Sequence, residues 1–162
     1  MEETRHRPFF VYGTLLPGQP NFFLWGADII AMESAVFHGA RLYDMGYYPM
    51  LVTAVPSETV QGMIITVNPA HFESVVQQLD ELEGYDPYQP EESGYRRRVV
   101  EVVLADGGFQ RAWVYLGDTA HVQDKPVIVG CSWAAYTANH QSDLQEWWKT
   151  IHTVAGLHKK SE

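Results

Sequence analysis

The sequence predicts an α+β fold with five or six β-strands and one well-formed helix. Strand-like runs rich in β-branched and aromatic residues cover residues 9–12, 35–43, 60–67, 95–104 and 110–116. Residues 69–83 instead carry apolar side chains at spacings of three and four, the period of an amphipathic helix. An Ala-Asp-Gly-Gly turn at 105–108 joins the last two runs and indicates a β-hairpin. A chain of 162 residues suits one domain with a substantial core.

The composition excludes several classes of protein. A content of 46% hydrophobic and 19% charged residues is typical of a globular protein, and no apolar run approaches the roughly 20 residues of a membrane span. A net charge of -9 disfavours nucleic-acid binding, which depends on Lys and Arg beside phosphates. Residues 1–8 lack the apolar segment of a secretory signal, so we expect a cytoplasmic protein without membrane or nucleic-acid partners. The oligomeric state is left open between a monomer and a weak dimer.

The first element is an apolar strand that breaks abruptly into small, turn-forming residues. Residues 9–12 suit a strand, and Gly13 both relaxes the backbone and permits close approach of a ligand. The amides of Gly13, Thr14 and Leu15 could then face an anionic or carbonyl oxygen. An ordinary strand followed by a tight turn explains these residues equally well.

The next elements are shorter or more ambiguous. Residues 22–30 predict a short helix or turn, residues 35–43 a second strand, and residues 44–56 turns around a short apolar patch at 50–52. Residues 60–67 form the clearest strand pattern. Gly62 within it indicates a bulge or a close backbone approach.

The predicted helix has a clear start and ends beside a glycine. Asn68 suits the capping position and Pro69 the first helical position. The period turns Glu83 toward the apolar side, while Asp80 and Glu81 are expected nearer the polar flank. A carboxylate directed inward is costly unless it is paired or has a chemical task.

The remaining residues predict packing more than chemistry. Residues 85–94 are expected to form a loop, and the basic run at 96–98 a solvated strand edge with Arg97 on the opposite face from its neighbours. Cys131 lacks a nearby histidine and is interpreted as inert, and no histidine pair has zinc-like spacing, so no metal site is expected. Residues 132–151 predict one or two short helices. We place the core at about 9–138 and a C-terminal helical extension at 139–162.

Three motifs together resemble the gamma-glutamyl cyclotransferase-like family. They are Tyr-Gly-Thr-Leu at 12–15 with Gly-Gln-Pro-Asn at 18–21, Leu-Asp-Glu-Leu-Glu-Gly at 79–84, and Ala-Trp-Val-Tyr at 112–115. Their order and approximate spacing match, and the resemblance extends from residue 9 to about 136. The first motif is most similar to the gamma-glutamylamine cyclotransferase branch. The resemblance implies a small mixed β-barrel of five to six strands with flanking helices.

The resemblance also implies an activity and a site. Family members cyclise a gamma-glutamyl amine or amino acid to 5-oxoproline and release the amine, without a cofactor. The family's general acid/base corresponds to Glu83, and its substrate-binding loop to Tyr12, Gly13, Thr14 and Leu15. Tyr115 corresponds to a pocket tyrosine, although a buried structural role fits it as well. A comparable family cluster implies that Gly46, Tyr48 and Pro49 line the pocket, and a structural turn is the simpler role for Pro49.

Two other functions and the choice of substrate stay open. The same pocket could belong to a non-catalytic small-molecule-binding or regulatory module. A plain interaction domain would need Trp133, Trp147 and Trp148 to face solvent together. For an enzyme, the leaving amine is undetermined, but acidic residues expected at the mouth favour a cationic amine such as a lysine side chain. These acidic residues are Glu81, Asp86, Glu91 and Glu92.

Overall fold

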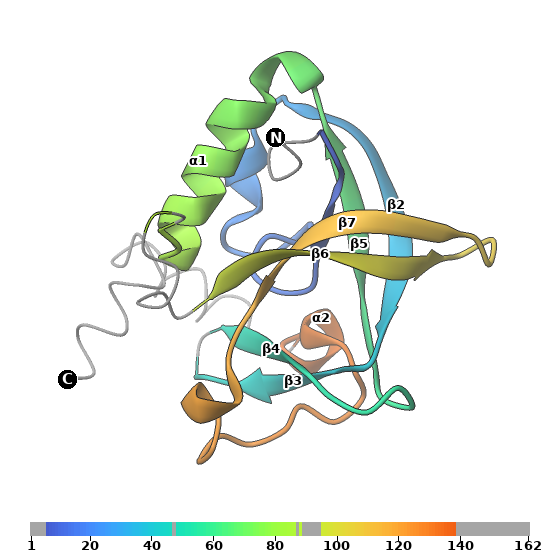
Figure 1. Cartoon of the computed structure of the whole chain (residues 1–162), viewed down its shortest axis with the longest axis vertical. Coiled ribbons are helices and arrows are strands. Elements are labelled where there is room, and N and C mark those ends of the chain that lie inside the picture. Colours follow the sequence, from blue (N-terminus) through green and yellow to red (C-terminus); the bar gives the residue numbers. More distant parts are fainter. Residues whose placement is uncertain (1–5, 47, 87, 89–94, 139–162) are drawn as a thin grey trace.

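A closed five-stranded barrel forms the centre of the molecule (Figure 1). The computed structural model describes residues 6–46, 48–86, 88 and 95–138, and the structural statements below concern these residues. The barrel order is β1-β5-β2-β6-β7, comprising β1 (Phe9–Val11), β5 (Thr59–Val67), β2 (Ile29–His38), β6 (Arg96–Leu104) and β7 (Phe109–Leu116). Only the β1–β7 contact, which closes the barrel, is parallel. The predicted α+β fold with a small mixed barrel is therefore confirmed.

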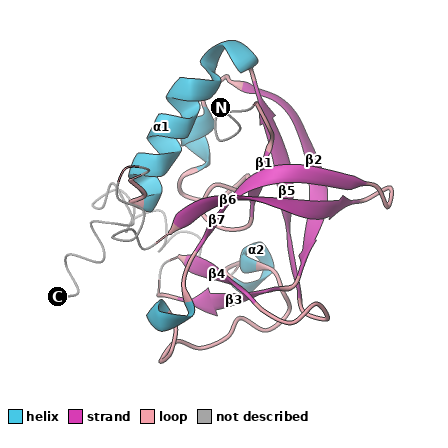
Figure 2. Ribbon diagram, viewed as in Figure 1, coloured by secondary structure: helices cyan, strands magenta, loops and turns pink. Residues whose placement is uncertain are grey.

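A second, two-stranded sheet lies below the barrel in the view of Figure 2. It consists of β3 (Ala40–Asp44) and β4 (Pro49–Thr53), paired antiparallel. The single strand predicted over 35–43 is therefore wrong. Gly39 has a φ of 89°, a left-handed conformation that turns the chain out of β2 and into the second sheet. The apolar patch at 50–52 is the centre of β4 rather than part of a turn.

The helix α1 (Phe72–Glu83) packs along one side of the barrel (Figure 1). It follows a 3₁₀ turn (Pro69–His71), and the Asn68 side chain accepts a hydrogen bond from the amide of Ala70 as the sequence predicts. Gly84 ends the helix in the left-handed conformation, with a φ of 72°. The buried side chains that join α1 to the barrel core are Phe72, Val75, Leu79 and Leu82.

Gly62 on β5 marks a close backbone approach, one of its two predicted roles. A Cβ atom at this position would overlap the carbonyl oxygen of Val11 and lie 2.8 Å from the Phe10 ring. The irregularity in the β2–β5 pairing lies instead between Ile29 and Ala31. The missing side chain thus lets β1 lie close beside β5 in the barrel wall.

The C-terminal part of the described chain is mostly irregular. It contains a 3₁₀ turn (Thr119–His121) and the short helix α2 (Trp133–Tyr136). Trp133 is 1% exposed and packs in the core, so it does not provide the solvent-facing surface that a plain interaction domain would need. Trp147, Trp148 and the predicted extension at 139–162 lie outside the described residues. Within the described segments, no helix is long and apolar enough to cross a membrane.

Candidate active site

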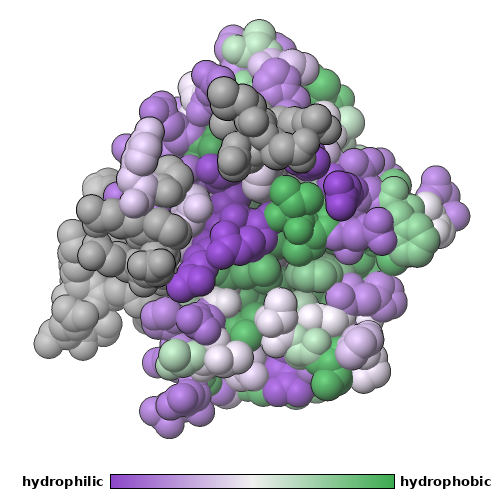
Figure 3. Space-filling view, viewed as in Figure 1, coloured by the Kyte–Doolittle hydropathy of each residue, from purple (hydrophilic) through white to green (hydrophobic). Residues whose placement is uncertain are grey.

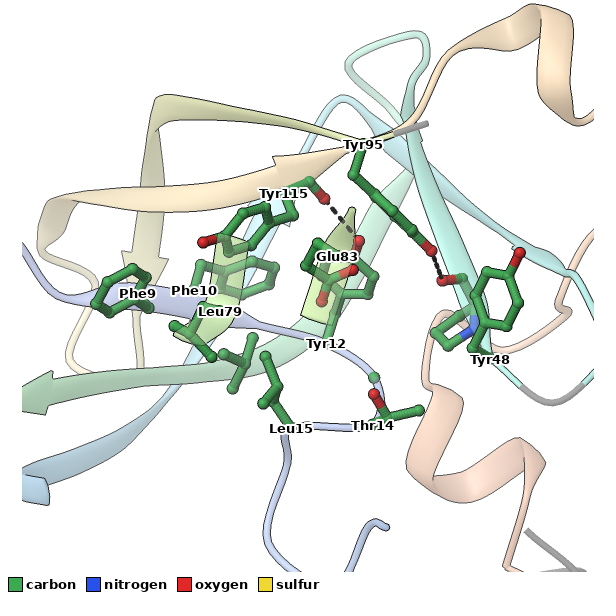
Figure 4. Close-up of a pocket in the computed structure, with 13 residues that line it drawn as sticks. Phe9, Phe10, Tyr12, Thr14, Leu15, Tyr48, Leu79, Glu83, Tyr95 and Tyr115 are labelled. Atoms are coloured by element: carbon green, nitrogen blue, oxygen red, sulfur yellow. Dashed lines mark hydrogen bonds between the residues drawn. The ribbon is translucent and has the colours of Figure 1, made fainter. Parts of the chain in front are cut away.

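One cavity brings together most of the residues that the sequence singled out (Figure 4). Tyr48 and Pro49 line it as expected, whereas Gly46 does not. The cavity has about 30 Å³ of space for the centres of water molecules, within about 460 Å³ of atom-free space that includes its open mouth. The accessible space of about 30 Å³ holds about two water molecules. The lining of the cavity comes from β1, the loop after β1, the start of β4, α1 and β7. The lining residues are Phe9, Phe10, Val11, Tyr12, Gly13, Thr14, Leu15, Tyr48, Pro49, Leu79, Glu83, Tyr95 and Tyr115.

Glu83 supplies the acidic group that lines this cavity. It is the last residue of α1, and its side chain points among the aromatic rings of Tyr12, Tyr95 and Tyr115 (Figure 4). No donor among the described residues makes a hydrogen bond to its carboxyl group. Desolvation by burial, and then the negative charge of Asp80, raise the pKa of Glu83 to about 8. The carboxyl group can therefore change its protonation state near neutral pH.

The tyrosines around Glu83 mostly use their hydroxyl groups within the protein. Tyr12 donates a hydrogen bond to the carbonyl oxygen of Tyr115, and Tyr95 donates one to that of Pro49, both at 2.6 Å. The Tyr115 hydroxyl donates to Asp80 Oδ1 at 2.6 Å. Burial raises the pKa of all three phenols well above the ordinary value, so they stay neutral. Their rings, rather than their hydroxyl groups, face the cavity.

The loop after β1 is held by its carbonyl oxygens and leaves amide groups available. The carbonyls of Gly13, Thr14 and Leu15 each accept a hydrogen bond, from the Leu16 amide, the Asn21 amide and the Trp25 indole respectively. Thr14 Oγ1 also accepts from the Asn21 side chain at 3.1 Å. Over the part of the chain described, the amides of Gly13, Thr14 and Leu15 have no protein acceptor. They are therefore available as donors to an oxygen atom of a bound ligand.

Gly13 is required for space rather than for unusual backbone angles. Its φ is not in the positive range, contrary to one of the two reasons expected from the sequence. A Cβ atom on Gly13 would lie 2.6 Å from Cγ of Pro49. The ring of Pro49 therefore packs directly on the loop, and Pro49 also accepts the hydrogen bond from Tyr95.

Two charged residues lie in environments other than those that the sequence predicts. Asp80 was expected near the polar flank of the helix, but it is 9% exposed and accepts a hydrogen bond from Arg97 Nε at 3.0 Å. Arg97 was expected at a solvated strand edge, but its side chain is also 9% exposed and its guanidinium lies 4.8 Å from the centre of the Trp113 ring. The alternation along β6 places Arg97 on the other face of the strand from Arg96 and Arg98. The sequence pattern does not show that α1 covers this face.

The residues expected at the mouth of the site are only partly described. Glu81 and Asp86 are exposed, as a charged rim requires, whereas Glu91 and Glu92 lie outside the described residues. No group of three or more His, Cys, Asp or Glu side chains that could hold a metal ion occurs in the described part of the chain.

Comparison with solved structures supports the same fold. YkqA from Bacillus subtilis is similar with a TM-score of 0.60 at 22% identity, over 85% of this chain but only 43% of YkqA. A protein from Arabidopsis thaliana with a known solution structure gives 0.56 at 24% identity, over 90% and 81% of the two chains. A uropathogenic E. coli-specific protein gives 0.53 at 20% identity, over 82% and 95%. At these identities the likeness concerns the fold alone.

Comparison of the sequence with protein-family models identifies the family. No curated protein matches this chain closely enough to supply a named relative. The family described as gamma-glutamyl cyclotransferase, AIG2-like matches residues 9–135, which include the β1 loop, Glu83 and the whole barrel. The chain therefore belongs to the gamma-glutamyl cyclotransferase, AIG2-like family.

Proposed function

We propose that this protein is an enzyme that cyclises a gamma-glutamyl amine to 5-oxoproline and releases the amine, with Glu83 as general acid and base. The observation that carries the proposal is the Glu83 carboxyl group itself. It lines a cavity, has no hydrogen-bond partner among the described residues, and has a pKa raised to about 8. A partly buried carboxyl group that lines the same cavity as free backbone amides suits proton transfer better than structural support.

The reaction needs few groups from the protein because the nucleophile comes with the substrate. The substrate's α-nitrogen attacks its own γ-carbonyl carbon, a five-membered lactam forms, and the bond to the leaving nitrogen breaks. Over the reaction the α-nitrogen loses two protons and the leaving nitrogen gains two. Glu83 can accept a proton from the first nitrogen and deliver one to the second, a contribution typically worth about 10²- to 10⁴-fold.

The protonation state of Glu83 follows from its partner in the complex. With a pKa of about 8, the carboxyl group is mostly protonated at pH 7 in the free protein. The positively charged α-ammonium group of a bound substrate favours the carboxylate, because opposite charges stabilise each other in a desolvated cavity. Binding would thus generate the base at the moment when it is needed.

The loop amides supply the other requirement of the reaction. As the γ-carbonyl carbon becomes tetrahedral, its oxygen develops negative charge. The amides of Gly13, Thr14 and Leu15 line the same cavity as Glu83 and are free to donate to that oxygen or to the substrate's carboxylate. The aromatic walls lower the polarity around the site, which strengthens each of these interactions.

Replacing Glu83 with glutamine tests the proposal. Glu83→Gln keeps the size of the side chain but removes its titratable proton, so release of 5-oxoproline is expected to fall by at least about 100-fold. Binding of a gamma-glutamyl ligand, measured by calorimetry, is expected to persist. The matched control is Glu73→Gln, which removes an exposed carboxylate from the first turn of the same helix and is expected to leave turnover unchanged. Near wild-type turnover in Glu83→Gln would exclude Glu83 as the base.

The leaving amine can be determined with a substrate panel. The exposed Glu81 and Asp86 near the end of α1 favour a cationic leaving group. Among gamma-glutamyl-ε-lysine, neutral gamma-glutamyl dipeptides and glutathione, we expect the lysine derivative to be turned over fastest. A preference for glutathione would refute this choice of amine. Ligand binding without turnover on any member would support the non-catalytic binding module instead.

A further inference from the structure

A buried ion pair lies one helical turn from Glu83 and has no part in the reaction described so far. Asp80 precedes Glu83 by three residues on α1, and therefore lies on the same side of the helix. Its Oδ1 atom accepts hydrogen bonds from Arg97 Nε at 3.0 Å and from the Tyr115 hydroxyl at 2.6 Å. Both charged side chains are about a tenth exposed, so the pair is largely removed from water.

Arg97 contacts the chain on both sides of Glu83. On the N-terminal side it binds Asp80, and on the C-terminal side its guanidinium lies 5.6 Å from the centre of the Tyr85 ring. The guanidinium also lies 4.8 Å from the centre of the Trp113 ring, on β7. The planar guanidinium thus joins the last turn of α1 to the barrel wall, through its hydrogen bonds to Asp80 and its contacts with the Tyr85 and Trp113 rings.

We propose that Asp80 and Arg97 form a positioning pair for Glu83, in which Arg97 fixes the last turn of α1 against the barrel and Asp80, held in the ion pair, places a negative charge one helical turn from the Glu83 carboxyl group. This inference rests on the proposed function of Glu83. It assigns to Asp80 and Arg97 a task that neither residue's position in the sequence indicated. A buried pair is weak evidence for stability by itself, because desolvating two charges offsets most of their attraction. The position of the pair next to Glu83, the proposed proton carrier, is therefore better explained by a role in positioning that residue.

The charges around Glu83 determine the direction of each effect. Asp80 is the negative neighbour that raises the pKa of Glu83, after the larger effect of burial. Arg97 partly offsets that charge through its contact with Asp80. The groups that face Glu83 from the other elements are neutral phenols: Tyr12, Tyr48, Tyr95 and Tyr115. Removing the Asp80 charge should therefore lower the pKa of Glu83, and removing the Arg97 charge should raise it.

The test is a direct titration of the Glu83 carboxyl group by ¹³C NMR, with its resonance identified by its loss in Glu83→Gln. Asp80→Asn keeps the shape of the side chain but removes its charge, and we expect the Glu83 midpoint to fall by about one pH unit. Arg97→Gln leaves the Asp80 charge uncompensated, and we expect the midpoint to rise by a similar amount. A merely structural role would loosen the site, admit water and lower the midpoint in both variants. That result, or no shift in Asp80→Asn, would overturn the inference.

Matched controls come from neighbouring residues on the same elements. Arg98→Gln removes an exposed arginine from β6, and Glu81→Gln an exposed carboxylate from α1, and neither is expected to move the midpoint. Arg97→Lys keeps the charge but loses the paired hydrogen bonds and the ring contacts, so its midpoint should stay near that of the wild type while its melting temperature falls. If Arg97→Gln does not fold, Arg97→Lys still decides the question, because a merely structural role would lower its midpoint.

The titration also separates this inference from the proposed function. If the wild-type protein releases no 5-oxoproline but the two midpoints move in opposite directions, the positioning pair stands and the activity fails. If the protein is active and the midpoints do not move, the activity stands and the pair fails. In an active protein, the pH at which kcat/KM rises should follow the NMR midpoint in each variant.

Discussion

The hydroxyl group of Tyr12 donates a hydrogen bond to the backbone carbonyl oxygen of Tyr115 across 103 positions of sequence, at 2.6 Å. The bond joins the loop after β1 to the end of β7, the two strands whose contact closes the barrel. Tyr12 is 8% exposed, and its ring faces the cavity while its hydroxyl serves the backbone. The proposed contribution of Tyr12 to substrate binding is therefore through its ring.

Replacing Tyr12 with phenylalanine isolates this hydrogen bond. Tyr12→Phe keeps the ring but leaves the buried carbonyl of Tyr115 without this donor, so we expect a loss of about 1–2 kcal/mol in the free energy of unfolding. Urea denaturation measures the change. Tyr88→Phe, at a residue 92% exposed, is the matched control and should leave the stability unaltered. An unchanged midpoint in Tyr12→Phe would show that water or another donor satisfies the carbonyl.

The raised pKa of Glu83 predicts a distinctive pH dependence of activity. Because the carboxylate is the base, kcat/KM should increase about tenfold per pH unit below a midpoint near pH 8, the pKa of Glu83 in the free protein. The substrate's ammonium group lowers the pKa of Glu83 in the complex, so kcat should rise at lower pH than kcat/KM does. Initial rates of 5-oxoproline release between pH 5.5 and 8.5 provide both curves. A kcat/KM independent of pH over that range would contradict the assignment.

The same shift predicts how stability depends on pH. Glu83 has a pKa of about 8 when folded and an ordinary value of 4.5 when unfolded, so the unfolded chain loses this proton first as the pH rises. The native state is therefore destabilised progressively between about pH 4.5 and 8, by a few kcal/mol in total. Glu83→Gln removes this penalty, and its stability relative to wild type should grow across that window and level off above it. Thermal unfolding at pH 5 and pH 8.5 measures the difference, with Glu81→Gln as the control that shows none.

Gly13 offers a test of the contact between the loop and β4. The Cβ atom of alanine at this position would lie 2.6 Å from Pro49 Cγ, so either the loop or the proline must move. We expect Gly13→Ala to raise KM for a gamma-glutamyl substrate at least tenfold and to destabilise the protein by about 1–3 kcal/mol. Gly108→Ala, in the exposed β6–β7 turn beside the flexible side chain of Asp106, is the control and should change neither quantity. A Gly13→Ala variant with normal KM would show that the amides need not keep their present positions.

The sequence predicts the elements whose signals are local. The helix ending at Glu83 has its capping residue, its period and its terminal glycine within 17 residues, and all three are present in the structure. The β6–β7 hairpin is equally local, since its turn chemistry lies between its two strands. The separation of β2 from β3 was missed because Gly39 interrupts an apolar run that continues on both sides.

The part of the site that the sequence could not supply depends on contacts between distant elements. Periodicity places Asp80 at the border of the apolar face, and alternation turns Arg97 away from its neighbours, but neither pattern states that the two residues meet. The resemblance supplied Glu83 and the loop after β1. It did not reveal that Pro49 fills the space left by Gly13, nor that three tyrosine hydroxyls are already used within the protein.

The three-residue strand β1 has a consequence for how the molecule acquires its site. β1 pairs with β5 and makes a single parallel contact with β7, between Phe9 and Trp113, so the barrel cannot close until residue 113 has been made. The substrate loop, Glu83 and the tyrosine at 115 are likewise brought together only by contacts of very long sequence separation. Closing such long loops slows folding, because the chain loses conformational entropy before the stabilising contacts form. Until the barrel closes, a nascent chain on the ribosome can form the β3–β4 pair and the helix, but not the binding cavity.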